Sequence, residues 1–264
     1  MADESGQTQA DSAEMSLFDH LTELRTRILY SALATALCAS VAFMFTEPLF
    51  SLLVDPFSAG FSGRDLIGTG PADAIFLRFK VACFAGLIFA LPVIFTQVWL
   101  FVAPGLLPHE KRMALPFIFT TTLLFALGLL FCYELILPPT FEFFASQYEV
   151  LGVTPQIRVT EHISIMMQLL LAFGISFELP VLAFLLGRFG VITHQSLIRA
   201  FRYAVVIIFI VAAVLTPPDP ISQLLMAGPL IALYGISIVV VRYTHRREIQ
   251  KEGSTEAAPS TTAG

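Results

Sequence analysis

Four short segments hold the charged and amide side chains that could do chemistry in this chain. They are Ser16–Arg27, Phe101–Arg112, Phe173–Pro180 and Leu215–Gln223. Each segment places a carboxylate next to a long apolar stretch. A carboxylate at such a boundary can pair with a guanidinium through two parallel hydrogen bonds, a geometry that an ammonium group cannot reproduce. A carboxylate inside an apolar stretch is a candidate for proton or partner contacts within a membrane.

The first two segments each have a structural interpretation beside the functional one. Glu23 and Arg27 are four residues apart, which predicts an ion pair on one face of a helix, whereas Arg25 projects roughly opposite Glu23. Glu110 follows Pro108, and an acidic residue there complements the positive end of a helix that begins at the proline. Periodicity alone therefore explains both carboxylates as features of helix ends.

The third and fourth segments put polar groups at membrane depth. Glu178 is flanked by apolar residues, and a charge in that place costs about 2.5–3.5 kcal/mol on insertion scales, so it is either a functional group or an internally bonded packing residue. The turn around Asp219 is stiffened by prolines, and Asp219 is expected to cap or fix it. Gln223 follows this turn, where its amide needs a partner.

The amino-acid composition is that of a membrane protein and not of a soluble one. The chain has 264 residues, of which 56% are hydrophobic and 13% charged, against roughly 45–50% and 25% in soluble proteins. The net charge of −5 argues against nucleic acid as a partner. Enzyme signatures such as HExxH, GxSxG and a nucleotide-binding loop are missing from the sequence, and three scattered cysteines form no metal motif, so we expect no enzyme, cofactor or metal.

Six apolar stretches are predicted to cross a membrane, which needs about 20 apolar residues per helix, and the fifth, Tyr203–Pro218, is short for this purpose. They are Ile28–Phe45, Val81–Pro108, Met113–Tyr133, His162–Phe177 with its continuation Leu179–Gly187, Tyr203–Pro218 and Ile221–Val241. The sequence thus predicts an all-α integral membrane protein with six transmembrane helices. Prolines 92, 180 and 229 should kink the second, fourth and sixth of them. The four-residue spacing of Ala82, Gly86 and Ala90 predicts close helix packing.

The distribution of Lys and Arg predicts the orientation. Most of the 15 basic residues fall on the side of the membrane that also holds the two termini. Because Lys and Arg are enriched on the cytoplasmic side of membrane proteins, both termini are predicted to lie in the cytoplasm. Two longer extracytoplasmic loops then lie near Pro48–Ile75 and Pro138–Thr160, and a short hairpin joins helices five and six. Residues 1–15 and 248–264 are polar and are predicted to be disordered tails around a membrane domain at 16–247.

Taken together, the motifs resemble the TatC family, the multispanning subunit of the twin-arginine protein translocase. The matching segments are His20–Arg25, Phe101–Pro104 with His109–Arg112, Phe173–Glu178 and Thr216–Asp219, in this order along the chain. The resemblance implies a receptor in the bacterial cytoplasmic membrane that binds twin-arginine signal peptides of folded cargo. It also implies single-span partners TatA and TatB, self-association in a receptor complex, contact with membrane lipid, and transport driven by the proton-motive force.

The resemblance assigns roles to individual residues. Signal-peptide binding falls to Glu23, Arg25, Phe101, Pro104 and Glu110. The depth of the polar groups in the membrane, apart from the resemblance, makes Glu178 and Gln223 the candidates for contact with a partner's span, with Asp219 fixing the turn before Gln223.

Two other classes of function remain open at this stage. A proton-coupled small-molecule transporter would use Glu178 as its proton carrier, but the charge-free middles of helices one, two, three and five disfavour it. An intramembrane enzyme would need a catalytic dyad divided between helices.

Overall fold

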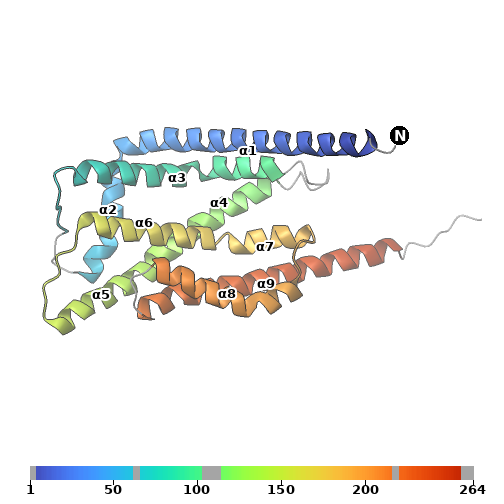
Figure 1. Ribbon diagram of the computed structural model, residues 1–264. Coiled ribbons are helices and arrows are strands. Elements are labelled where there is room, and N and C mark those ends of the chain that lie inside the picture. The colour runs from blue at the N-terminus through green and yellow to red at the C-terminus, as the bar shows by residue number, and fades with distance from the viewer. Residues whose placement is uncertain (1–3, 62–65, 103–113, 216–219, 257–264) are drawn as a thin grey trace, which may run out of the picture. The chain divides into compact units, whose positions relative to one another are not determined.

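The computed structural model describes residues 4–61, 66–102, 114–215 and 220–256, and of these the side chains of residues 20–58, 61, 66–102, 114–215 and 220–243. Nearly all of these residues are helical, as Figure 1 shows. The helices are α1 (Glu4–Met44), α2 (Thr46–Gly60), α3 (Asp73–Val102), α4 (Ala114–Phe131), the π-helical turn η3 (Cys132–Ile136), α5 (Leu137–Leu151), α6 (Val159–Ser176), α7 (Leu179–Arg188), α8 (His194–Leu215) and α9 (Pro220–Glu256).

Six helical stretches within the described residues are long and apolar enough to cross a membrane, which confirms the predicted number. They are His20–Met44, Asp73–Val102, Ala114–Leu151, Val159–Arg188, His194–Leu215 and Pro220–Tyr243. Each contains one of the charge-free stretches or most of it. Most of the observed helices are longer than the charge-free stretches because they include charged residues at their ends, where a helix continues past the apolar core of the membrane into its polar interface.

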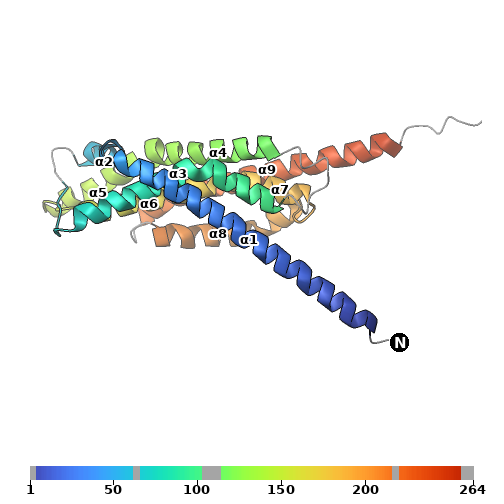
Figure 2. The ribbon, with the colours of Figure 1, turned by 90° about the horizontal axis from the view of Figure 1, so that it is seen from above.

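The chain divides into two compact units, and the first comprises residues 1–52 and 68–122. Its main contact is between α1 and α3, which lie side by side in Figures 1 and 2. The two helices are antiparallel, because Arg27 near the start of the first span bonds to Gln97 near the end of α3, and Arg78 near the start of α3 bonds to Thr46, just past the end of α1. Between these ends Gly86 faces α1 so closely that a Cβ atom there would lie 2.5 Å from the backbone of Ala39. The predicted close packing of this small-residue stripe is confirmed.

The second unit comprises residues 53–67 and 123–264. Here α4 and α6 approach at two glycines: a Cβ on Gly128 would lie 2.8 Å from the carbonyl oxygen of Phe173, and one on Gly174 would lie 2.5 Å from the ring of Phe125. Helix α9 packs against both α7 and α8. At the α7–α9 contact, Gly187 meets the side chain of Val241.

The segments after α2 and before α6 are joined by backbone within the second unit. The amide of Ile67 donates to the carbonyl of Ile157 at 3.0 Å, and the amide of Val159 donates to the carbonyl of Ile67 at 3.0 Å. Buried His162 adds a side-chain link, because its Nε2 donates to the carbonyl of Leu53 at 3.2 Å. These contacts anchor the second half of α2 on the start of α6.

Both predicted outer loops contain a helix that was not predicted from the sequence. Residues 46–60 form α2, and residues 137–151 form α5, which continues from α4 through the π-helical turn. The prolines that suggested loops, Pro48 and Pro138 with Pro139, stand in the first turn of these helices. Pro48 is tolerated at the start of α2 because its missing N–H would have had no partner within that helix. Pro138 and Pro139 directly follow the π-helical turn, where the regular α-helical hydrogen-bond pattern is already interrupted.

At Pro180, where a kink was predicted, the fourth span is divided in two, since α6 ends at Ser176 and α7 begins at Leu179. Helices α3 and α9 run through Pro92 and Pro229 as single elements. Helix α8 has 22 residues and is longer than its charge-free window. Only the part of α8 after Arg202 is free of charge, so the apolar part of this helix is shorter than the roughly 20 residues that a membrane core needs.

Near the termini the helices extend further than the predicted membrane domain. Helix α1 begins at Glu4, inside the segment expected to be a disordered tail, and α9 continues to Glu256. The division into tails and a membrane domain at 16–247 stays a prediction.

Candidate functional site

An ion pair within α1 and a hydrogen bond from α1 to α3 share the guanidinium of Arg27 near the start of the first span. Nη2 of Arg27 lies 3.0 Å from Oε1 of Glu23, which confirms the predicted i,i+4 pair. Nη1 of the same guanidinium donates to Oε1 of Gln97 on α3 at 3.4 Å. The exposed fractions are 27% for the Arg27 side chain and 30% for that of Glu23. The pair is therefore partly shielded from water, unlike a fully solvated surface ion pair.

A ring contact lies on the same faces of these helices, one turn further along. The rings of His20 and Phe101 stack with their centroids 4.4 Å apart and an angle of 23° between their planes. His20 precedes Glu23 by three residues and Phe101 follows Gln97 by four, so each pair shares a helix face. We call His20, Glu23, Arg27, Gln97 and Phe101 the α1/α3 cluster. It combines a guanidinium-binding carboxylate with an aromatic surface.

The remaining residues proposed for peptide binding do not belong to this cluster as described. Arg25 is exposed on α1. Pro104 and Glu110 lie outside the described residues, so their assignment stays a prediction.

Glu178 occupies the break between α6 and α7 and is buried, with an exposed fraction of 7%. Its backbone is satisfied, because its N–H donates to the carbonyl of Ile175 at 3.1 Å and its carbonyl accepts from Leu182 at 2.9 Å. Its Oε1 is also buried but has no hydrogen-bond partner among the residues that the structure describes. A buried carboxyl oxygen without a partner is destabilising, which makes this residue hard to explain by packing alone.

The amide of Gln223 has a partner within the protein. Its Nε2 donates to the carbonyl of Phe209 at 2.9 Å, which links α9 to α8. The expectation that this amide needs a partner is therefore met within the protein. Contact between Gln223 and another protein stays a prediction. Asp219 lies outside the described residues.

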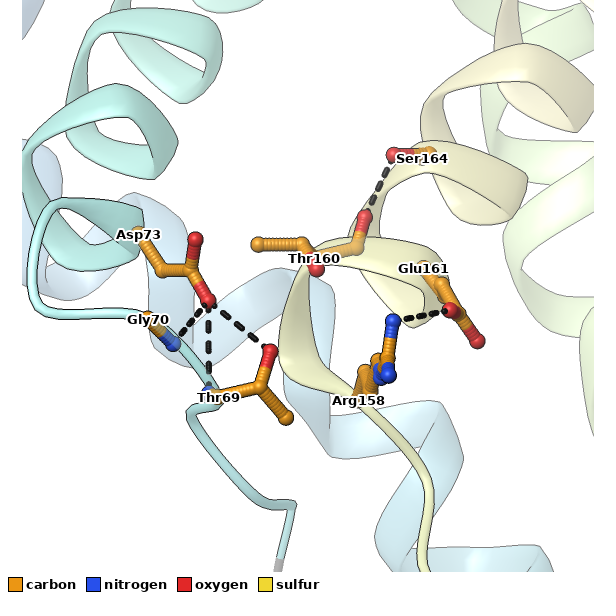
Figure 3. Close-up of polar contacts among 7 residues, drawn as sticks. All are labelled: Thr69, Gly70, Asp73, Arg158, Thr160, Glu161 and Ser164. Carbon is orange, nitrogen blue, oxygen red and sulfur yellow. Dashed lines mark hydrogen bonds and ion pairs between the residues drawn. The ribbon is translucent and has the colours of Figure 1, made fainter.

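Figure 3 shows two further polar groups, one from each unit, that are explained locally. Oδ2 of Asp73 accepts from the amide and hydroxyl of Thr69 at 3.2 and 3.1 Å and from the amide of Gly70 at 2.7 Å, which fixes the chain before α3. Arg158 lies 3.5 Å from Glu161 in an exposed pair at the start of α6. Neither arrangement points to a ligand, and within the described residues no group of three His, Cys, Asp or Glu side chains could hold a metal ion.

Three members of the α1/α3 cluster, His20, Arg27 and Gln97, are not among the predicted site residues, although Arg27 was expected to pair with Glu23. Gln97 is the one amide in the charge-free run from Val81 to Val102, and that isolation is the signal that could have drawn attention to it. Its partner Arg27 is 70 positions away, so only the packing of the two helices reveals the contact.

The six spans and a cluster that presents a carboxylate beside an aromatic ring define a multispanning membrane protein with a polar site at one end of its first helical hairpin. Residues 19–229 match the family model described as Sec-independent protein translocase protein (TatC). The TatC protein of Magnetococcus marinus is 39% identical over 243 residues, which are 91% of this chain and 89% of that protein. The TatC protein of Aquifex aeolicus is 38% identical over 240 residues, 90% of this chain and 100% of that protein.

Solved structures agree with these relatives. A crystal structure of the twin-arginine translocase receptor TatC superposes with a TM-score of 0.79 at 37% identity, covering 86% of this chain and 99% of that chain. The chain belongs to the TatC family and is a multispanning subunit of the Sec-independent protein translocase. The family is one of translocase proteins and not of enzymes, so membership decides against the intramembrane-enzyme and small-molecule transporter hypotheses.

Proposed function

We propose that this protein is the receptor subunit of the twin-arginine translocase, which binds the paired arginines of signal peptides on folded cargo. The observation that carries the proposal is the Glu23 carboxylate, which holds a guanidinium at 3.0 Å beside the ring stack of His20 and Phe101. A peptide with paired arginines followed by an apolar segment needs both features. Glu110 would receive the second arginine, Arg25 would orient the N-terminal segment, and Pro104 would shape the loop beside Phe101.

We expect Glu23→Ala and Glu110→Ala each to weaken binding of a twin-arginine peptide by about 1.5–3 kcal/mol, the usual contribution of a hydrogen bond to a charged group. A Lys-Lys peptide should bind the unaltered protein weakly, because an ammonium group cannot form the paired hydrogen bonds of a guanidinium. The measurement is crosslinking or equilibrium binding of labelled peptides to the purified full-length chain.

The control variant for these two is Glu161→Ala. It removes the acidic partner of the exposed Arg158 pair and should leave peptide binding unchanged. Unaltered peptide binding in both Glu23→Ala and Glu110→Ala would count decisively against the assignment.

The proposed orientation places both termini in the cytoplasm of a bacterial cell and the protein in its cytoplasmic membrane. The basic residues that flank the two termini support this orientation. In this orientation the α1/α3 cluster faces the compartment where cargo folds.

We expect a cysteine introduced at Ser196 to react with reagents from the cytoplasm and one at Gln147 to react from outside. The three native cysteines should first be replaced, since Cys83 is exposed. Both residues are exposed in the structure, so a failure to react reports sidedness and not burial. Labelling of both positions from the same side contradicts the orientation.

Recruitment of TatA and TatB is the second part of the proposal, with Glu178 and Gln223 as the contact residues and Asp219 as the residue that fixes the turn before Gln223. The buried, unpartnered Oε1 of Glu178 supports it, because a polar group from a partner's single span would satisfy that oxygen. Copurification of single-span partners with the full-length chain tests this part.

A further inference from the structure

The Glu23 carboxylate already has a cationic partner in the protein. The guanidinium of Arg27 reaches across from α1 to α3 and bonds to both Glu23 and Gln97 through its two terminal nitrogens. A ligand arginine that binds Glu23 would use the same type of group on the same carboxylate. The two guanidinium groups therefore compete for one acceptor.

Arg27 is held incompletely in this position. The contact to Gln97 is long at 3.4 Å, and Nε of Arg27 is buried with no hydrogen-bond partner among the described residues. A buried donor without a partner is unfavourable and gains free energy when it reaches water. The side chain thus neutralises Glu23 while giving up part of its own hydrogen bonding.

We propose that Arg27 is an internal substitute for the arginine of the signal peptide. It occupies the Glu23 carboxylate in the unbound protein, and peptide binding exchanges one guanidinium for another. This inference rests on the proposed function and adds to it the group that the peptide displaces. The exchange keeps a partly buried carboxylate paired at every stage, which avoids the cost of an isolated charge at the edge of the membrane.

Removal of the substitute should strengthen binding. We expect Arg27→Gln to lower the Kd for a twin-arginine peptide about two- to fivefold, the range for loss of a competing ion pair that is still partly exposed to water. The Kd for the Lys-Lys peptide should fall by the same factor, because either peptide must displace the same group. The measurement is fluorescence anisotropy of labelled peptide with the full-length chain in detergent. A purely structural role for Arg27 predicts weaker binding of the twin-arginine peptide and contradicts the proposal.

A gain in affinity could also arise because a positive charge near a cationic peptide has been removed. Arg27→Lys keeps that charge but pairs less well with a carboxylate, so we expect an intermediate Kd. If Arg27→Lys binds like the unaltered protein while Arg27→Gln binds more tightly, charge alone is responsible and the proposal is wrong. Arg158→Gln removes the arginine of the other described ion pair and should leave the Kd unchanged.

Gln97 supplies an independent test, because its role in this scheme depends on Arg27. Gln97→Leu frees Arg27 from α3 and should lower the Kd less than Arg27→Gln does. In the Arg27→Gln background the same change should have no further effect. A weaker affinity of Gln97→Leu in that background would mean that Gln97 binds the peptide directly, which overturns the assignment of Gln97 as the residue that holds Arg27.

The failure of this inference can be told apart from the failure of the proposed function. Peptide binding that is insensitive to Glu23→Ala removes the recognition site, and the exchange with it. Binding that depends on Glu23 but does not tighten in Arg27→Gln leaves the receptor function standing and rejects the exchange alone.

Discussion

Substitution of Gly86 by alanine is expected to lower the free energy of unfolding by about 1–3 kcal/mol, the usual cost of adding a methyl group to a filled interface. The new Cβ would lie 2.5 Å from both the Cα and the amide nitrogen of Ala39 on α1. These are backbone atoms, so no side-chain rotation relieves the overlap and the two helices must separate. Denaturant or thermal unfolding of the purified protein in detergent measures the effect.

Gly228 provides a matched control for this prediction. It also lies inside a membrane-crossing helix, but nothing lies within 4 Å of a Cβ placed there. Gly228→Ala should therefore be neutral or stabilise the protein by up to about 1 kcal/mol, as expected when a helix gains alanine in place of glycine. Equal stability changes in the two variants would refute the idea that Gly86 fixes the distance between α1 and α3. Peptide binding should weaken only in Gly86→Ala, because the α1/α3 cluster depends on that distance.

The number and approximate position of the spans could be predicted because the membrane imposes a simple length requirement on apolar segments. The helices in the predicted outer loops, α2 and α5, could not be predicted in the same way, because that length requirement does not apply to loops. Pro138 and Pro139 indicated a loop, but in the structure they stand in the first turn of α5. The same residue types therefore fit two structures, and only the π-helical turn before Leu137 shows how the chain continues as a helix.

The candidate site was predictable to the extent that its contacts are local in sequence. Glu23 and Arg27 were paired from their spacing, and the structure places them 3.0 Å apart. The bond from Arg27 to Gln97 and the stacking of His20 on Phe101 arise from the packing of α1 against α3. Helix periodicity predicts which face a residue occupies but not which face of another helix it meets.

The buried carboxyl group of Glu178 is expected to lower the stability of the protein while serving its function. In the structure its Oε1 is buried without a hydrogen-bond partner among the described residues, which costs about 1–3 kcal/mol for a neutral group and more for a charge. An apolar residue of similar size would remove that cost. We therefore expect Glu178→Leu to unfold at the same or a higher denaturant concentration than the unaltered protein. Such a residue is retained at a cost in stability, as groups at functional sites often are.

Export of a twin-arginine cargo should change in the opposite direction from stability: replacing Glu178 by an apolar residue should not destabilise the protein but should reduce export. Glu178→Gln keeps the shape and a hydrogen-bonding side chain, so we expect it to retain export if a partner's span needs only a polar group there. Glu178→Ala and Glu178→Leu remove that group and should abolish export while the protein still inserts in the membrane. The matched control is Ser237→Ala, since Ser237 is also buried in a span but its hydroxyl donates to the carbonyl of Leu233 in its own helix at 2.9 Å. Full export by Glu178→Ala would return Glu178 to the role of a packing residue, because a carboxyl group that no partner contacts can be removed without loss.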